Sequence, residues 1–302
     1  MNELNYQEYE HCSLCYRNCK VNRNQGELGY CKMNNQLVAA RAALHFWEEP
    51  CISGEAGSGT VFFSGCSLAC VYCQNHDIAL GTTGKPLSTD RLSNIFLELQ
   101  EKGALNINLV TPTHYVPQIV TALKKAKASG LTLPIVYNTG SYDTVHTIRQ
   151  LRGLIDIYLP DLKYYSSDLS LRYSNAPHYF EHATSTIQEM FEQVQTPVFD
   201  GERMIRGMIV RHLALPNALE DSKQILSYLY ETYHDDIYVS ILNQYTPLPK
   251  VSKYPEINRT LTEEEYEELV DYAIELGYTN AFIQEGETAQ ESFIPPFTCE
   301  GI

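Results

Sequence analysis

The sequence predicts an α/β fold with parallel strands, preceded by a cysteine-rich N-terminal extension. From residue 60 onward, short apolar runs alternate with amphipathic stretches, and a polar turn follows each run. Such runs are typical of strands buried on both faces, and strand–helix alternation implies right-handed crossovers between parallel strands. Eight of the nine cysteines lie before residue 74. The pattern permits a barrel or an open doubly wound sheet, and in both arrangements ligands gather at the carboxyl ends of the strands.

Seven short runs rich in Val, Ile, Leu or Tyr are the candidate strands. They cover residues 60–64, 106–110, 135–137, 154–158, 208–213, 237–242 and 280–283. Their lengths and the polar residues after them are those expected of strands in a parallel sheet.

Four stretches with apolar residues at helical spacing are the candidate helices. The first follows Ser88 and ends at Gly103, and the second ends at Gly130. Glycine is a common residue just past a helix end. Thr262 and Glu265 match a capping box at the start of the last helix. The apolar stripes lie within residues 92–99, 116–123, 187–194 and 266–273.

Size and charge limit the function classes. A chain of 302 residues can bury a large core, and its net charge of −15 disfavours a nucleic-acid partner, which would need a cationic surface. No apolar run is long enough to span a bilayer, and no leader is recognised, so we expect no membrane partner and a cytoplasmic location. In a reducing compartment, clustered cysteines are more often metal ligands than disulfides.

The most informative segment is the loop after the first candidate strand, where Cys66, Cys70 and Cys73 follow a C-x3-C-x2-C spacing. A cluster that only carries electrons takes four thiolates, so three ligands leave one iron open for chemistry. The alternative is a zinc knuckle, but structural zinc prefers four protein ligands. The spacing therefore favours a cluster with one reactive corner.

This loop, with Tyr72 before its last cysteine, resembles the signature of the radical S-adenosylmethionine (SAM) superfamily. The segments 60–66, 110–114, 161–163 and 283–287 are similar to an uncharacterised branch related to pyruvate formate-lyase activating enzymes. The resemblance implies a partial, TIM-like parallel (β/α)6 barrel over residues 56–290, after a cysteine-rich extension (1–55) and before a C-terminal tail (291–302).

The same resemblance implies the cofactors and partners. A 4Fe–4S cluster on Cys66, Cys70 and Cys73 would bind SAM at its open iron and cleave it to a 5′-deoxyadenosyl radical, with Tyr72 near the cofactor. It further implies a reductant such as flavodoxin or ferredoxin, and a glycyl radical enzyme as the partner protein.

One segment departs from the superfamily pattern. Many members carry Gly-Gly-Glu after the second strand, which binds the SAM amino group, whereas this chain has Thr111-Pro112-Thr113-His114. Threonine hydroxyls or backbone carbonyls are acceptors that could replace the carboxylate. His114 is interpreted either as a cofactor contact or as a helix N-terminal residue with no ligand role.

Other polar residues follow later strands. Asp161 and Lys163, two residues apart at a strand end, share one face, and the activating enzymes have Asp-x-Lys at the matching place in contact with the cofactor. The alternative is a surface ion pair. Arg211 lies within an apolar run and should meet a carboxylate, from the cofactor or from a protein residue such as Glu285. Asn138 supplies an uncharged donor and acceptor at the same edge.

A second metal site is predicted in the extension. Cys12, Cys15, Cys19 and Cys31 lie within about 20 residues, and four thiols could bind zinc or an additional iron–sulfur cluster. Buried unreactive thiols are the alternative. The segment 41–50, with its aromatic and acidic residues, is interpreted as a lid over the cluster or as ordinary packing.

These observations leave three functions open. The leading one is a radical SAM enzyme that activates a glycyl radical enzyme. The second is radical modification of a peptide or a small metabolite. The third is a non-catalytic electron carrier, which would need a fourth thiolate on the main cluster.

Overall fold

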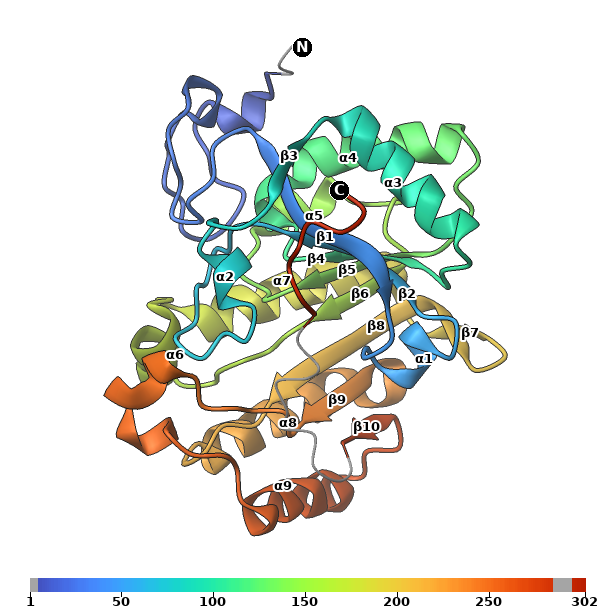
Figure 1. Cartoon of the computed structure of the whole chain (residues 1–302). Helices are drawn as coiled ribbons and strands as arrows, with labels where there is room; N and C mark the ends of the chain where they lie inside the picture. Colours follow the sequence, from blue (N-terminus) through green and yellow to red (C-terminus); the bar gives the residue numbers. More distant parts are fainter. Residues whose placement is uncertain (1–4, 285–294) are drawn as a thin grey trace.

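A mostly parallel β-sheet forms the centre of the chain in the computed structural model, which describes residues 5–284 and 295–302 (Figure 1). The strands, in chain order, are β1 Leu37–His45, β2 Ser58–Phe63, β3 Lys85–Leu87, β4 Ile107–Val110, β5 Ile135–Thr139, β6 Ile157–Pro160, β7 Val198–Asp200, β8 Arg203–Leu213, β9 Tyr238–Leu242 and β10 Ala281–Ile283.

The strand order is β10-β9-β8-β6-β5-β4-β2-β1-β3, and β7 pairs with β8 alone. The run from β2 to β10 is parallel, whereas β1 is antiparallel to both β2 and β3. Within the described residues, β3 and β10 stand at opposite ends of this order, so the barrel is partial, as expected. The parallel run has seven strands there, one more than six, because the three-residue β10 is added beside β9.

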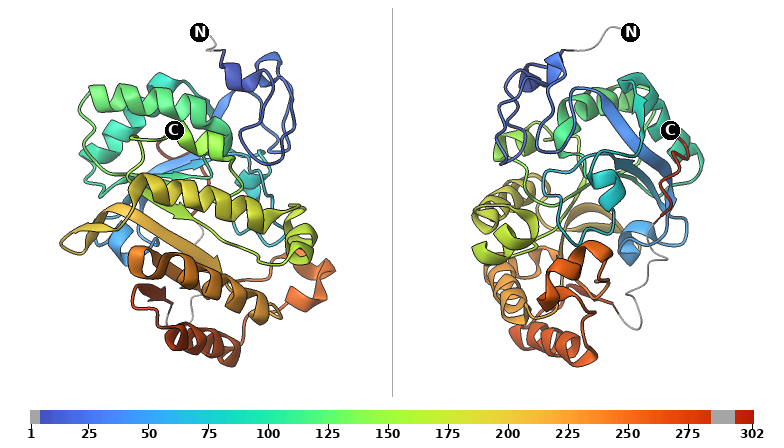
Figure 2. Two further views of the ribbon diagram at one scale, coloured as in Figure 1. Left: turned by 180° about the vertical axis from the view of Figure 1, so that it is seen from behind. Right: turned by 60° about the vertical axis from the view of Figure 1, so that its left-hand side comes forward.

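Helices cover the outer side of the sheet. Figure 2 shows α4, α7, α8 and α9 following one another down this side. The helices are α1 Pro50–Ser53, α2 His76–Ala79, α3 Thr89–Glu101, α4 Val116–Ala128, α5 Val145–Arg149, α6 Ser167–Ser174, α7 Tyr179–Val194, α8 Leu219–Tyr233 and α9 Glu263–Leu276. The 3-10 helices are η1 Gln7–Tyr9, η2 Arg23–Gln25, η3 Thr113–Tyr115, η4 His234–Asp236, η5 Pro249–Lys253 and η6 Pro255–Ile257.

The core lies between the sheet and these helices. Strands β2, β4, β5 and β6 are buried along their whole length, as expected of strands covered on both faces. Phe96 of α3 and Ile119 of α4 belong to the same buried cluster as Leu109 and Tyr137 of the sheet. Burial of these apolar faces is the main stabilising contribution to the fold.

The sequence predicted most of these elements. The four helical stripes correspond to α3, α4, α7 and α9, and the capping box is present, since Thr262 Oγ1 accepts from Glu265 N at 3.2 Å. The prediction of a strand at 154–158 is wrong in its bounds, because β6 begins at Ile157. The Asp156 carboxylate accepts from Ile135 N at 2.9 Å and belongs to the turn before the strand.

Both ends of the chain contact the sheet. β1 lies within the cysteine-rich extension, and the tail runs along it, with hydrogen bonds from Ala42 N to Glu300 O (2.8 Å) and from Cys299 N to Ala40 O (2.9 Å). The division of the chain at residues 55 and 290 stays a prediction.

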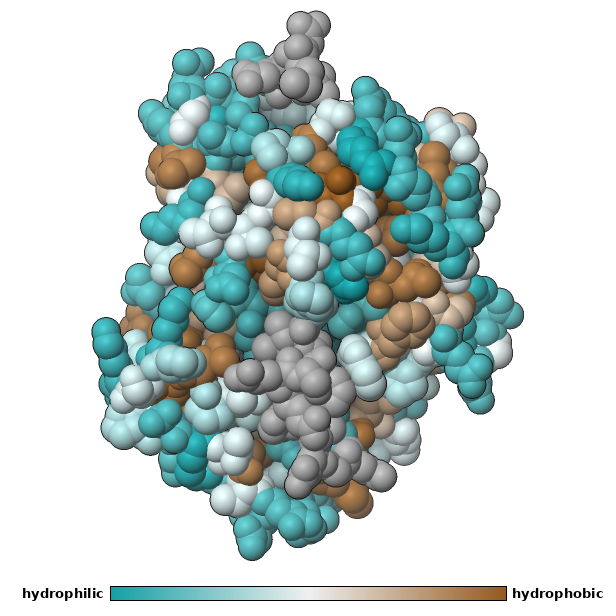
Figure 3. Space-filling view, viewed as in Figure 1, coloured by the Kyte–Doolittle hydropathy of each residue, from teal (hydrophilic) through white to brown (hydrophobic). Residues whose placement is uncertain are grey.

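None of the helices formed by the described residues is long and apolar enough to cross a membrane. In the view of Figure 3, the surface is hydrophilic over most of its area, with hydrophobic residues in separate groups.

Candidate active site

A cavity of about 240 Å³ lies at the carboxyl ends of the parallel strands. Its wall takes residues that follow successive strands: Cys66 after β2, Thr111 after β4, Gly140 after β5 and Asp161 after β6. Arg211, near the end of β8, completes this side. The parallel arrangement therefore brings together residues that are far apart in the sequence, at the edge where the fold predicts a ligand site.

The cysteine loop forms one side of this cavity. Cys66, Cys70 and Cys73 are each half-buried and all three line the cavity. The backbone N–H of Leu68 lies 3.4 Å from Cys66 Sγ, and Cys73 N donates to Cys70 O at 3.1 Å. The loop is thus folded so that all three cysteines line the same cavity.

The loop is held in place by the N-terminal extension. Gly65 has a φ of +91°, and a Cβ at this position would lie 2.7 Å from Cys31 O, so a larger residue would collide with backbone. Arg17 donates to Ser67 O (2.6 Å), to Ser174 O (2.8 Å) and to the carbonyl of Asn175. One guanidinium therefore links the extension, the loop and the end of α6.

The number of cysteines at the cavity suits an iron–sulfur cluster with three protein ligands. All nine cysteines are described, and only Cys66, Cys70 and Cys73 lie on the cavity wall. Cys51 is buried in a separate hydrophobic cluster with Val136. Among residues 5–284 and 295–302, no three His, Cys, Asp or Glu side chains already stand close enough to hold a single metal ion. The donor chemistry and the shared cavity nevertheless suit an iron–sulfur cluster.

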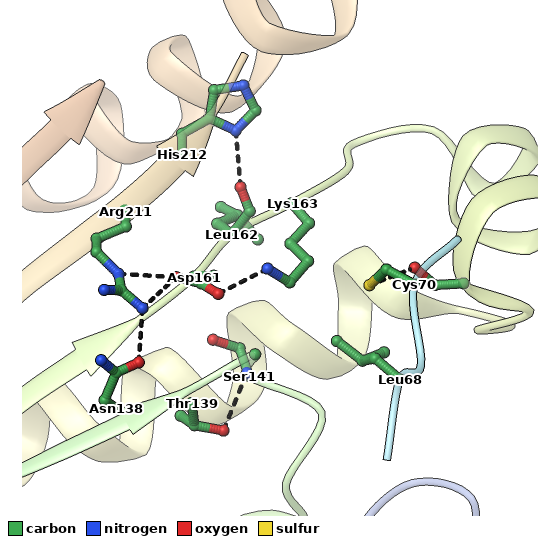
Figure 4. Close-up of polar contacts among 12 residues, drawn as sticks. Leu68, Cys70, Asn138, Thr139, Ser141, Asp161, Leu162, Lys163, Arg211 and His212 are labelled. Atoms are coloured by element: carbon green, nitrogen blue, oxygen red, sulfur yellow. Dashed lines mark hydrogen bonds and ion pairs between the residues drawn. The ribbon is translucent and has the colours of Figure 1, made fainter. Parts of the chain in front are cut away.

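An ion-pair network forms the wall opposite the loop (Figure 4). Asp161 is its centre: Lys163 Nζ lies 2.6 Å from Oδ2 and Arg211 Nε 2.8 Å from Oδ1. Arg211 also contacts Glu48 Oε2 at 3.2 Å and Asn138 Oδ1 at 2.6 Å. The carboxylate expected for Arg211 is thus present within the protein. The alternative partner Glu285 lies outside the described residues.

The electrostatics keep most of this network charged. Burial would raise the pKa of Asp161, but Arg211 and Lys163 lower it overall. Burial would likewise lower the pKa of Lys163, but Asp161 raises it. For Glu48, burial raises the pKa, and Arg211 offsets only part of the effect. Asp161 and Lys163 both line the cavity, and their side chains are only 19% and 16% exposed, so they form no surface ion pair.

Other predicted residues differ in their placement. Tyr72, Thr111, Thr113 and Asn138 line the cavity. His114 does not: it is buried behind the wall, with Nε2 2.7 Å from Ser64 O. Burial lowers the pKa of His114 to about 3, so its ring is neutral near pH 7. The predicted cofactor contact of His114 stays a prediction.

Three residues at the site have left-handed backbone conformations although they are not glycine. Ala69 in the cysteine loop, Thr111 after β4 and Ser141 after β5 have φ values of 52°, 57° and 63°. Such conformations are unfavourable for residues with a Cβ, most of all for β-branched threonine. They often mark functional sites, where the surrounding structure imposes them.

Glu48 is the main site residue that the sequence did not identify individually. It follows β1, accepts from Asn108 Nδ2 at 2.9 Å and lines the cavity together with His45 and Trp47. The segment 41–50 was predicted only as a lid or as packing, and these three residues form part of the wall. No spacing rule connects Glu48 to Arg211, 163 residues later, so only the fold brings them together.

The four cysteines of the extension lie near one another. Cys12, Cys15 and Cys31 are buried and Cys19 is half-buried. A Cβ on Gly29 would lie 3.4 Å from Cys31 Sγ and 3.6 Å from Cys19 Sγ, so this glycine leaves room for both sulfur atoms. The donor set suits zinc or a cluster, and the metal site stays a prediction.

Fold and site together define an α/β protein with a partial parallel barrel and a three-cysteine loop at its carboxyl edge. Residues 60–207 match the model of the Radical SAM superfamily. This match covers 148 of the 302 residues, includes the cysteine loop and agrees with the resemblance inferred from that loop.

One curated protein and two solved structures are similar to this chain. An uncharacterized protein of Methanocaldococcus jannaschii is 29% identical over 274 residues, covering 88% of this chain and 75% of that protein. SuiB of Streptococcus suis, solved with SAM bound, is similar at a TM-score of 0.54 and 15% identity, over 74% of this chain and 49% of SuiB. The FeFe-hydrogenase maturase HydG is similar at a TM-score of 0.52 and 14% identity, over 76% of this chain and 52% of HydG. The chain thus spans about half the length of either solved protein, and these two likenesses concern the fold.

Proposed function

We propose that this radical SAM protein binds a 4Fe–4S cluster through Cys66, Cys70 and Cys73 and acts as an activating enzyme on a glycyl radical partner. When bound, the cluster supplies one electron that breaks a carbon–sulfur bond of SAM, giving methionine and a 5′-deoxyadenosyl radical that abstracts hydrogen. The observation that carries the proposal is that these three thiols, and no other cysteine of the chain, share the cavity with the Asp161 network.

The side chains of the cavity have separate roles in this proposal. Lys163 lines the cavity together with the cysteine loop, and its ammonium is directed at Asp161 (Figure 4). It pairs with the carboxylate of SAM, because an ammonium is a strong donor to anions. Asp161 and Arg211 hold Lys163 in place and satisfy each other's charge. Hydroxyls of Thr111 and Thr113 accept from the SAM amino group in place of the missing Gly-Gly-Glu carboxylate.

The partners follow from the same chemistry. The cluster needs a one-electron reductant such as flavodoxin or ferredoxin, and the thiols need a reducing compartment such as the cytoplasm. The extension would carry zinc or a second cluster on Cys12, Cys15, Cys19 and Cys31. Radical modification of a peptide or small metabolite uses the same cavity chemistry and differs only in the molecule that loses hydrogen.

The test is reductive cleavage of SAM by the anaerobically purified and iron-reconstituted protein. With dithionite and SAM, we expect release of 5′-deoxyadenosine and a change in the cluster's EPR signal when SAM is added. If neither appears on a loaded protein, the radical chemistry is refuted. A carbon-centred EPR signal on a co-incubated glycyl radical enzyme would support the activating role. If a cognate partner shows no such signal, the activating role is refuted, and modification of a peptide or a small metabolite remains.

We expect Lys163→Ala to keep its iron but to bind SAM at least about tenfold more weakly. The variant removes a charge-assisted hydrogen bond, and ~1.4 kcal/mol corresponds to a factor of ten in affinity. Titration of the EPR signal with SAM measures this change. Lys124→Ala, an exposed lysine on α4, is the matched control and should leave the affinity unchanged. An unaltered affinity in Lys163→Ala contradicts the role given to this lysine.

A further inference from the structure

A chain of three hydroxyl groups starts at Tyr72 in the cysteine loop and returns, through Tyr164 and Ser174, to Cys70 of the same loop. Tyr72 Oη donates to Tyr164 Oη at 2.6 Å, and Tyr164 Oη lies 2.7 Å from Ser174 Oγ. Ser174 Oγ donates in turn to Cys70 Sγ at 2.9 Å. The last contact is the only hydrogen bond from a side chain to a sulfur of the cysteine loop that the described residues form.

The direction of each bond is determined by the number of protons. A hydroxyl carries a single proton, and that of Ser174 is directed at the sulfur. The bond between Tyr164 and Ser174 must therefore use the proton of Tyr164, and the bond between Tyr72 and Tyr164 must use that of Tyr72. All three protons point toward Cys70, so the dipoles add and strengthen one another.

The surroundings fix this chain in place. Tyr72, Tyr164 and Ser174 are 5%, 1% and 3% exposed, so water does not compete for their hydroxyls. The end of α6, which carries Ser174, is bound to the loop by Val71 N donating to Tyr173 O at 2.9 Å. Arg17 holds the carbonyl of Ser174 as well. The hydroxyl of Ser174 is thus preorganised toward the sulfur.

We propose that Ser174, oriented by Tyr164 and Tyr72, is a positioning residue that raises the reduction potential of a cluster held by Cys70. The proposal rests on the proposed function, because it requires iron at this cysteine. Reduction adds one negative charge to the cluster and its thiolates. A hydroxyl donating to a ligand sulfur stabilises this charge, and hydrogen bonds to sulfur are among the factors that set cluster potentials.

The test is the midpoint potential of the reconstituted cluster, followed by EPR during redox titration. Ser174→Ala should keep its iron and show a lower potential, by ~59 mV for a tenfold loss in the equilibrium constant of a one-electron reduction. Tyr164→Phe keeps the ring and removes the proton that orients Ser174, so it should lower the potential by less. Ser174→Thr keeps the hydroxyl and should restore the parent value.

Ser170→Ala is the matched control on the same helix. Ser170 is as buried as Ser174, but its hydroxyl bonds to the carbonyls of Ser167 and Ala176 and not to the loop, so its variant should keep the parent potential. A loaded Ser174→Ala protein with the parent potential overturns the proposal. If Ser174→Ala assembles no cluster, the potential of the Tyr164→Phe protein becomes the test. A Tyr164→Phe protein with the parent potential also overturns the proposal. A parent protein that binds no iron would instead refute the proposed function.

Discussion

Cys70→Ala is expected to remove the cluster and, with it, all SAM cleavage. Each of the three thiols on the cavity wall would supply one ligand, and no other cysteine of the chain lines this cavity. Cys51 is buried among apolar side chains such as Val136, so it offers no replacement. The EPR signal that responds to SAM and the release of 5′-deoxyadenosine should both fall to background, whereas metal bound by Cys12, Cys15, Cys19 and Cys31 should stay.

Cys51→Ala is the control for this experiment. It removes a buried thiol that the proposal gives no ligand role, so iron content should stay at the parent value. If Cys70→Ala retained a full cluster with its EPR signal, the ligand assignment of the loop would be wrong. If the parent protein bound zinc in the loop in place of iron, the whole radical mechanism would be excluded.

Arg211→Met is expected to give the largest loss of folding stability among the site variants, about 3 kcal/mol. The substitution leaves Glu48 without its cation and Asp161 with Lys163 alone, and breaking a buried ion pair from one side typically costs about 3–5 kcal/mol. Because Lys163 still pairs with Asp161, we expect a loss at the lower end of this range. Urea unfolding of the metal-free protein measures the change.

The loss of folding stability in Arg211→Met should depend on pH. Burial already raises the pKa of Glu48, and loss of Arg211 raises it further, so this carboxyl takes up a proton more readily in the folded variant. A group with a raised folded-state pKa gains relative stability as the pH falls, so the deficit should shrink toward acidic pH. Arg206→Met, exposed on the same strand, should change stability by less than about 0.5 kcal/mol. Equal stability of the two variants would contradict the structural role of Arg211.

The fold could be predicted where one strand or helix carries its own signal. The seven parallel strands and four of the long helices have a hydrophobic pattern that is visible locally. β1 was missed because it lies in a cysteine-rich segment and pairs antiparallel with β2, outside the strand–helix alternation. α8 was also missed, although Ile225, Leu226 and Leu229 lie on one buried face at helical spacing. That signal was available in the sequence.

The site was predictable in its parts and not in its contacts. Cys66, Cys70 and Cys73 follow from spacing, and Asp161 and Lys163 from their place at a strand end. The pairing of Arg211 with Glu48, and the bond from Ser174 to Cys70, join residues more than 100 positions apart. Such contacts depend on strand order and on how a loop packs, which local patterns do not specify.

The hydrogen bonds from Arg17 to the carbonyls of Ser67 and Ser174 have a consequence for folding during synthesis. The two carbonyl groups that shape the loop come from chain segments more than 100 residues apart, so the loop cannot take its final form while α6 is still inside the ribosome. Domains emerge from the N-terminus first, and long-range contacts form late. Assembly of the proposed cluster therefore belongs after synthesis of α6, and a nascent chain that stops short of α6 should leave its loop thiols open to oxidation.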